Sequence, residues 1–200
     1  VKRLASAYRV ALTDRTAVGY TLAMTAITGA LFGFINSSQQ IFEHVFHAAD
    51  VFPLVFAGIA GGIAGGTLLN ATFVERLGSR LIAHTALIAF TGVAAIHAAV
   101  SALGFETLWT FALLQGLTMF CFGFMAGNMG SMAMEPMGHI AGTASSAQGF
   151  VSTTFGSLLG FAIGQQFSGS ATPMATGVAV CGLIAIGCSF WAEGGRIVHA

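Results

Sequence analysis

The chain has 200 residues, of which 56% are hydrophobic and only 7% are charged, and its seven Lys/Arg balance its seven Asp/Glu. A soluble globular domain carries roughly 25% charged residues, so the composition excludes an ordinary water-soluble protein and indicates one that lies in a lipid bilayer. A net charge of zero provides no global field that would attract nucleic acid, and we expect no nucleic-acid partner.

Residues 1–15 differ from the rest of the chain because they hold four of the seven basic side chains, together with apolar residues near helical spacing. This segment is predicted to be a cytoplasmic basic linker or a helix lying on an anionic membrane surface, and the pattern does not choose between them. Because the chain begins at Val1 within a polar segment, we expect further residues before it.

Residues 16–200 contain six long apolar runs, each near the ~20 residues that a helix needs to cross about 30 Å of hydrocarbon. Their apolar residues are continuous and do not alternate, which excludes a closed β-barrel. We therefore predict an all-α membrane protein with six transmembrane helices. The runs are 17–40, 51–71, 81–103, 108–132, 143–165 and 173–192.

The basic residues predict the orientation of the six spans. All seven Lys/Arg fall in segments on one side, whereas the loops on the other side contain Glu43, Asp50 and Glu106 and no basic residue. Because basic loops remain in the cytoplasm, both termini are predicted to be cytoplasmic. His84 and His97 lie near the ends of the third span, and we expect them at the membrane interface.

Glycine is concentrated in the second and fifth spans, where small residues recur at four-residue spacing. Such spacing lets helices approach closely. One interpretation is packing within this bundle. The other uses the position of the two spans, each the middle of a group of three, as in the 3+3 inverted repeat of many transporters; the glycine faces would then contact a second bundle.

Polar residues of the first span recur every three or four positions and share one helix face. They are Thr21, Thr25, Thr28, Asn36 and Gln39, with Phe32 among them. A polar stripe should not face lipid, so it either forms hydrogen bonds between helices or lines an aqueous cavity. In the second case Asn36, Gln39 and the adjacent Gln40 are the predicted substrate-binding residues.

The fourth and fifth spans offer further candidates for ligand contact. On the fourth, Gln115 is surrounded by Met119, Phe122 and other apolar side chains, which suits apolar ligands of varied shape, although a packed helix has the same pattern. On the fifth, Gln148 is assigned equally to ligand contact and packing. Asn128, Ser145 and Gln148 are also expected to form hydrogen bonds between helices.

Two segments resemble the major facilitator superfamily. Residues 70–80 contain Glu75, Arg76, Gly78 and Arg80 in the acid-basic-x-Gly-basic order of the superfamily's cytoplasmic loop motif, although Ala71 replaces its leading glycine and Ser79 one of its basic residues. Residues 127–146, with Met-Glu-Pro-x-Gly at 134–138, resemble the junction between the fourth and fifth spans in the second half of Bcr/CflA-type drug efflux proteins.

This resemblance covers nearly the whole chain and implies the C-terminal half, helices seven to twelve, of a twelve-helix drug/proton antiporter in a bacterial inner membrane. It implies that the N-terminal six-helix half is missing from this chain, that residues 75–80 gate the cytoplasmic side, and that the substrates are small apolar or amphipathic compounds. It also implies a proton gradient as the energy source, with no cofactor.

Two other functions are compatible with the residues: a facilitator half for a nutrient or metabolite, and a six-helix structural subunit. An enzyme is not expected, because the chain has no nucleophile motif, no Cys/His cluster with zinc spacing and no phosphate-binding loop. No metal site is expected either.

Overall fold

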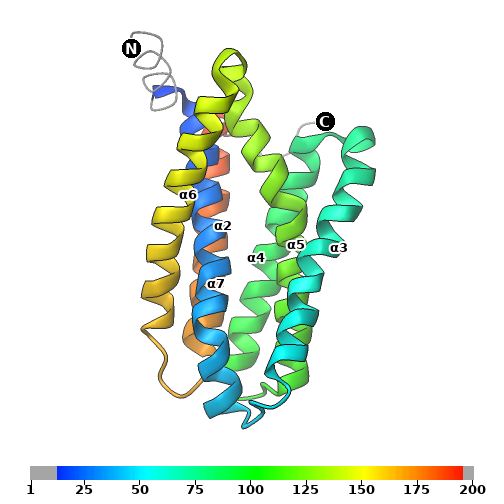
Figure 1. Cartoon of the computed structure of the whole chain (residues 1–200), viewed down its shortest axis with the longest axis vertical. Helices are drawn as coiled ribbons and strands as arrows, with labels where there is room; N and C mark the ends of the chain where they lie inside the picture. Colours follow the sequence, from blue (N-terminus) through cyan, green and yellow to red (C-terminus); the bar gives the residue numbers. More distant parts are fainter. Residues whose placement is uncertain (1–12, 196–200) are drawn as a thin grey trace.

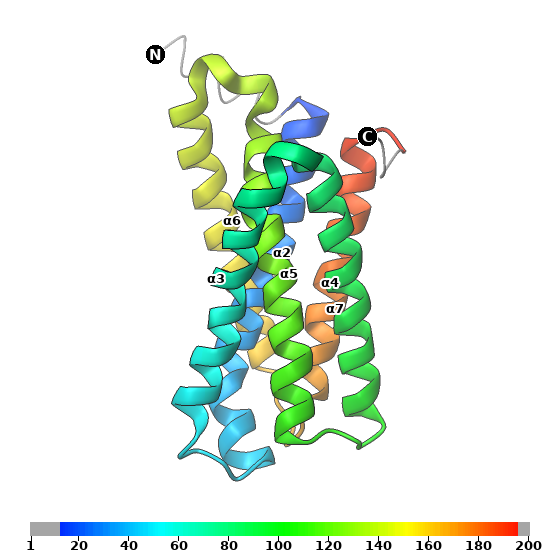
Figure 2. The ribbon, with the colours of Figure 1, turned by 90° about the vertical axis from the view of Figure 1, so that its right-hand side faces the viewer.

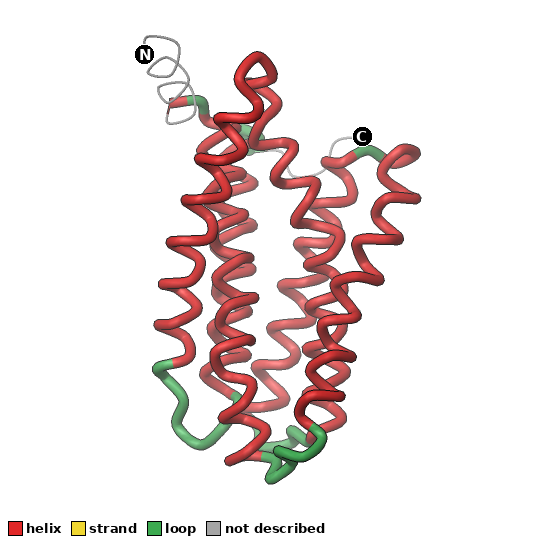
Figure 3. Tube along the Cα trace, viewed as in Figure 1, coloured by secondary structure: helices red, strands yellow, loops and turns green. Residues whose placement is uncertain are grey.

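The computed structural model describes residues 13–195, with the side chains of residues 139 and 140 left out, so the expectation for residues 1–15 lies almost wholly outside the described part. The described residues form long helices and no strand (Figure 3). The α-helices are α2 (Arg15–Gln40), α3 (Phe52–Leu77), α4 (Ser79–Ala102), α5 (Leu108–Met134), α6 (Ala141–Gly164) and α7 (Thr172–Ala192). A π-helix, η1 (Ile41–Val45), follows α2, and a 3-10 helix, η2 (Glu135–Ile140), joins α5 to α6.

Short polar signals start and end these helices. Asp14 caps α2 by accepting a hydrogen bond from the Ala17 amide at 2.9 Å, and Thr107 caps α5. Gly78, with φ of +79°, separates α3 from α4 by itself. The apolar runs at 51–71 and 81–103 left residues 72–80 as a connecting loop, and this prediction is wrong at its start, because α3 continues through Leu77 and one glycine makes the turn.

The prediction of an all-α membrane protein is confirmed. Five helical segments, those that contain α2, α3, α4, α5 and α7, are long and apolar enough to cross a membrane. The sixth, α6, has 24 residues and lies along α2 (Figure 1). It is less apolar because its first half is rich in Ser, Thr and Gly and contains Gln148.

The six helices form two interleaved groups of three. The first described helix, α2, packs mainly against α6 and α7, and α5 packs mainly against α3 and α4 (Figures 1 and 2). Contacts between α2 and α5 and between α4 and α7 join the groups. The set of helix pairs in contact stays the same when α2 is exchanged with α5, α3 with α6 and α4 with α7. This is the contact symmetry of a 3+3 repeat.

Most glycines of the second and fifth spans pack inside this bundle. A methyl group added at Gly160 of α6 would lie 2.6 Å from the carbonyl carbon of Phe32 and 2.7 Å from the backbone nitrogen of Gly33. On the other side of the bundle, Gly62 of α3 packs against the backbone of Gly116 in the same way. Packing within the bundle therefore accounts for these glycines, whereas Gly58 and Gly61 have open space around them.

One of the three expected hydrogen-bonding residues joins two helices. Asn128 of α5 donates to the side-chain oxygen of Asn70 in α3 at 2.7 Å, as predicted. Ser145 instead donates to the carbonyl of Gly142 in its own helix, since this bond is available one turn away. The Nε2 atom of Gln148 is buried and has no hydrogen-bond partner within residues 13–195.

Candidate functional site

A charged cluster lies at the end of the bundle where the described chain starts and finishes. Arg80, in the first turn of α4, donates from Nη2 to Glu135 Oε2 at 2.6 Å and from Nε to Glu193 Oε1 at 2.9 Å. Glu135 begins η2, where Pro136 ends α5, and Glu193 follows the last residue of α7. One guanidinium therefore links three segments that are distant in sequence.

The cluster continues inward from Glu193 through hydrogen bonds between side chains. The Tyr20 hydroxyl of α2 donates to Glu193 Oε1 at 2.6 Å and lies 2.8 Å from Nε2 of His84 in α4. The Tyr20 and His84 rings also stack, with centroids 6.1 Å apart. Arg80, Glu193, Tyr20 and His84 thus form one connected chain from the bundle end into its interior.

Electrostatics favour the charged form of Glu193. Partial burial raises its pKa, but hydrogen bonds from Tyr20 and Arg80 and the positive charge of Arg80 outweigh this effect and hold the pKa below its ordinary value. Glu193 is therefore a carboxylate that accepts hydrogen bonds from two different helices.

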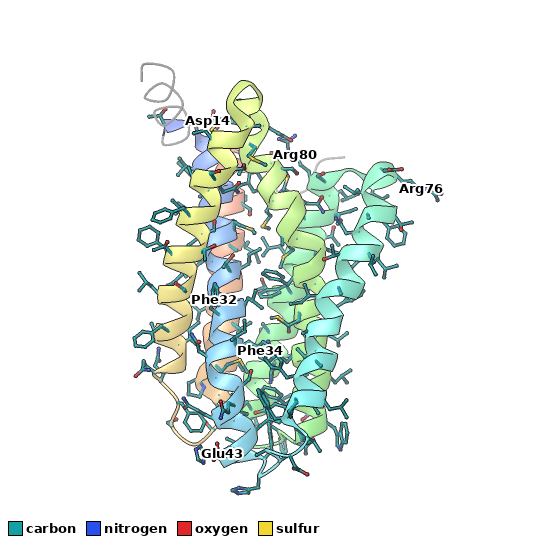
Figure 4. All side chains as sticks on the ribbon, in the orientation of Figure 1. Asp14, Phe32, Phe34, Glu43, Arg76 and Arg80 are labelled. Carbon is teal, nitrogen blue, oxygen red and sulfur yellow. The ribbon has the colours of Figure 1, made fainter. Side chains whose placement is uncertain are left out.

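Only two of the four predicted gating residues belong to this charged cluster. Arg80 forms the ion pairs described above, and Gly78 makes the turn before it. Glu75 and Arg76 are exposed and form no ion pair within residues 13–195; Figure 4 shows Arg76 at the outer corner of α3. Of the four residues, only Arg80 and the adjacent turn residue Gly78 thus lie at the charged cluster.

Sequence analysis missed the partners of Arg80. Glu135 and Glu193 each lie where a helix ends on the side that holds the basic residues. Opposite charges at the same end of a bundle could have indicated these ion pairs. His84 follows Arg80 by four residues and so shares its helix face. The side chains of His84 and His97, which were expected at the membrane interface, are almost fully buried in the bundle, at 3% and 1% exposure.

A second buried polar cluster lies at the opposite end. His97 Nε2 of α4 lies 2.6 Å from Glu106 Oε1 in the α4–α5 loop, and Ser101 donates to Glu106 Oε2 at 2.6 Å. Ser101 also lies 3.0 Å from the Thr172 hydroxyl, which connects the loop to α7. Phe111 covers the His97 ring edge-on. The Glu106 side chain is 7% exposed and thus largely covered by its partners.

The polar stripe of α2 is split by the packing. Its first part, Thr25 to Phe32, lies against α6. Thr25 Oγ1 is 3.4 Å from Ser152 Oγ, and Phe32 contacts Gly160. Figure 4 shows Phe32 on the α6 side of α2. Further along the helix, Asn36, Gln39 and Gln40 are exposed. Residues Thr25 to Phe32 of the stripe therefore serve packing between helices, and the three amides beyond them remain accessible.

The predicted residues of α5 lie in the packed interior. Gln115 and Met119 are fully buried and Phe122 is 7% exposed. Neither amide atom of Gln115 has a hydrogen-bond partner within residues 13–195. The structure does not bring these side chains onto one surface with the exposed amides of α2, and Gln148 is buried on α6.

These features define an all-α integral membrane protein that carries ionisable clusters at both ends of its bundle. Among its described residues, no three His, Cys, Asp or Glu side chains come close enough to hold a metal ion.

The chain is similar to an uncharacterized MFS-type transporter, YdgK, of Bacillus subtilis (strain 168), with 25% identity over 163 residues. The similar region covers 76% of this chain but 38% of the relative, so the chain spans well under half of that protein. No protein-family model and no solved structure matches the chain. The similarity supports the major facilitator superfamily, and with the apolar helices it supports transmembrane transport over an enzymatic role.

Proposed function

We propose that this chain is the C-terminal half, helices seven to twelve, of a twelve-helix transporter that works by alternating access. The observation that carries the proposal is the interleaved packing of two three-helix groups, which is the repeat unit of many secondary transporters. The 38% coverage of an MFS-type relative agrees with it. The missing partner is then an N-terminal six-helix half.

The proposed orientation places the Arg80 end in the cytoplasm of a bacterial cell and the bundle in its inner membrane. Arg76 and Arg80 lie at one end of the bundle and Glu43 at the other (Figure 4). Basic residues stay on the cytoplasmic side of a membrane. In this orientation the Arg80 ion pairs close the cytoplasmic end and break when it opens.

We assign substrate contact first to the amides of α2. Asn36, Gln39 and Gln40 are exposed in the last two turns of α2, close to the end opposite Arg80. Exposed amides among apolar side chains suit small apolar or amphipathic compounds. Gln115, Met119, Phe122 and Gln148 would reach a substrate only after the helices around them rearrange.

The proposed reaction is export of such compounds in exchange for protons, as in Bcr/CflA-type drug/proton antiporters. The second candidate is a facilitator half for an uncharged metabolite, because exposed amides also suit hydroxyl-rich substrates. A dependence of transport on the proton gradient separates the two.

The test is transport by the full-length protein after Asn36→Ala and Gln39→Ala substitution. A polar group of a ligand left without its partner costs about 1–3 kcal/mol, so affinity should fall about 5- to 150-fold while thermal stability stays unchanged. Ile35→Ala is the matched control, because Ile35 is an exposed neighbour on the same helix. If both amide variants transport normally, α2 does not bind the substrate.

A further inference from the structure

The chain of hydrogen bonds from Glu193 to His84 connects water with a buried basic group. The two inner members are buried and the outer one reaches the surface: His84 is 3% exposed, Tyr20 is fully buried and the Glu193 side chain is 20% exposed. Consecutive side chains are 2.8 and 2.6 Å apart. The three residues come from α4, α2 and the end of α7, so only the folded bundle assembles the chain.

Each member has the chemistry that proton transfer requires. A carboxylate at the surface takes a proton from water, a phenol donates and accepts at the same oxygen, and an imidazole nitrogen holds a proton. Arg80 keeps its own proton, so its role is to hold Glu193 in place. We propose that His84 is a proton-binding site that exchanges protons with water through Tyr20 and Glu193.

The inward step balances without any other reactant. A proton from water adds to the Glu193 carboxylate. The Tyr20 O–H turns from Glu193 to His84 Nε2, and the new Glu193 O–H donates to the Tyr20 oxygen. The Glu193 O–H bond breaks as a new Tyr20 O–H bond forms, while the original Tyr20 proton passes to His84 Nε2. Glu193 returns to carboxylate, Tyr20 stays neutral and His84 becomes an imidazolium. Release follows the same steps in reverse.

The surroundings supply the counter-charge that a buried imidazolium needs. Glu193 faces it through Tyr20, and Glu135 lies beyond Arg80. Among the described residues, the other titratable or charged groups on the elements packed at this end are Asp14, Arg15, Glu75, Arg76 and Cys188. Asp14 is occupied in capping α2, and Glu75 and Arg76 are exposed at the corner of α3.

The opposite cluster lacks such a path. His97 and Glu106 are paired, but among the described residues their further hydrogen bonds lead only to the hydroxyls of Ser101 and Thr172. His97 therefore serves as an internal comparison for His84: both are buried histidines of α4, and only His84 connects to a partly exposed carboxylate at a helix end.

The proposal deepens the proton coupling proposed above and rests on it for the role of His84 in transport. The experiment therefore measures proton binding directly. The full-length protein, with isotope-labelled histidine, is reconstituted in lipid nanodiscs, and the His84 ring signal is assigned by its loss in His84→Gln. The signal should shift between pH 5 and 8 in the absence of substrate. A signal that stays constant over this range overturns the proposal.

The path is tested by the rate at which the His84 ring proton exchanges with water. Tyr20→Phe keeps the stacked ring and removes the relay oxygen, and a lost acid–base group commonly costs about 100-fold or more in rate, so exchange should slow about 100-fold. Glu193→Gln keeps an acceptor for Tyr20 but cannot carry the proton; it should slow exchange similarly, and it carries the test if Tyr20→Phe does not fold.

Thr25→Ala is the matched control, because it removes a hydroxyl from the same helix outside the relay; it should exchange at the wild-type rate. Wild-type exchange in both relay variants overturns the proposed path. If His84 binds protons by this path while transport ignores the proton gradient, the relay stands and the proposed antiport fails.

Discussion

The close contact of α6 with α2 gives the sharpest test of the packing. At Gly160 a methyl group would lie 2.6 Å from the carbonyl carbon of Phe32 and 2.7 Å from the Gly33 nitrogen. Carbon atoms pack best at about 3.5–4.0 Å, and backbone atoms cannot rotate away as a flexible side chain would. Gly160→Ala therefore requires the two helices to separate locally by about 1 Å.

Such overpacking costs about 1–3 kcal/mol, part of which is offset because alanine is the better helix former by about 0.5–1 kcal/mol. Gly149→Ala is the matched control: Gly149 lies on the same helix and a methyl group there meets nothing within 4 Å. The difference between the two variants isolates the packing effect, about 1–3 kcal/mol.

Thermal unfolding in one detergent or nanodisc preparation measures this difference. For a chain of this size 1 kcal/mol shifts Tm by about 2–4 °C, so Gly160→Ala should unfold about 2–12 °C below Gly149→Ala. If both variants unfold at the same temperature, α6 does not approach α2 as closely as the structure indicates, and the account of its glycines is wrong.

Three further predictions follow from contacts at the ends and in the middle of the bundle. Because the pKa of Glu193 is lower in the folded protein than in the unfolded chain, where it lies near 4.3, its pairing stabilises the fold above that pH and is lost as pH falls through the folded value. The stability advantage of the wild type over Glu193→Gln should therefore shrink between pH 6 and pH 3, and a constant difference would contradict the pairing. A double-mutant cycle between Asn70 and Asn128 should give a coupling of about 0.6 kcal/mol, the usual value for hydrogen bonds between membrane helices; no coupling would mean that the 2.7 Å contact is absent. In a background without the native cysteines, cysteine at the exposed Glu75 should react with impermeant reagents only from the cytoplasm and cysteine at the 72%-exposed Phe105 only from outside, and reaction of both from one side would exclude the proposed topology.

The helices themselves were predictable because hydrocarbon thickness fixes their length and apolar runs mark them. The runs predicted at 17–40 and 173–192 correspond to α2, which begins at Arg15, and to α7, which begins at Thr172. The error at residues 72–77 arose because polar and charged residues continue a helix beyond the hydrocarbon, where composition no longer separates helix from loop.

The charged cluster was not predictable from local patterns, since its members are far apart in the chain. Tyr20 and Glu193 are separated by 173 positions and Arg80 and Glu135 by 55. Periodicity shows which residues share a face of one helix, but not which helix that face meets. The same limit left the polar stripe of α2 open between packing and cavity, and only the position of α6 assigned Thr25 and Phe32 to packing.

The interleaving of the two groups bears on how the chain is made. The 100 residues between Gln40 and Ala141 separate α2 from α6, one of its two main partners, and α3 likewise inserts before α5, its main partner. At about 5–20 residues per second of synthesis, the face of α2 that packs against α6 stays uncovered in the bilayer for about 5–20 s. Helices α2, α3 and α4 thus form a membrane intermediate without a core of their own, and a chain that stops after α4 is a substrate for membrane quality control.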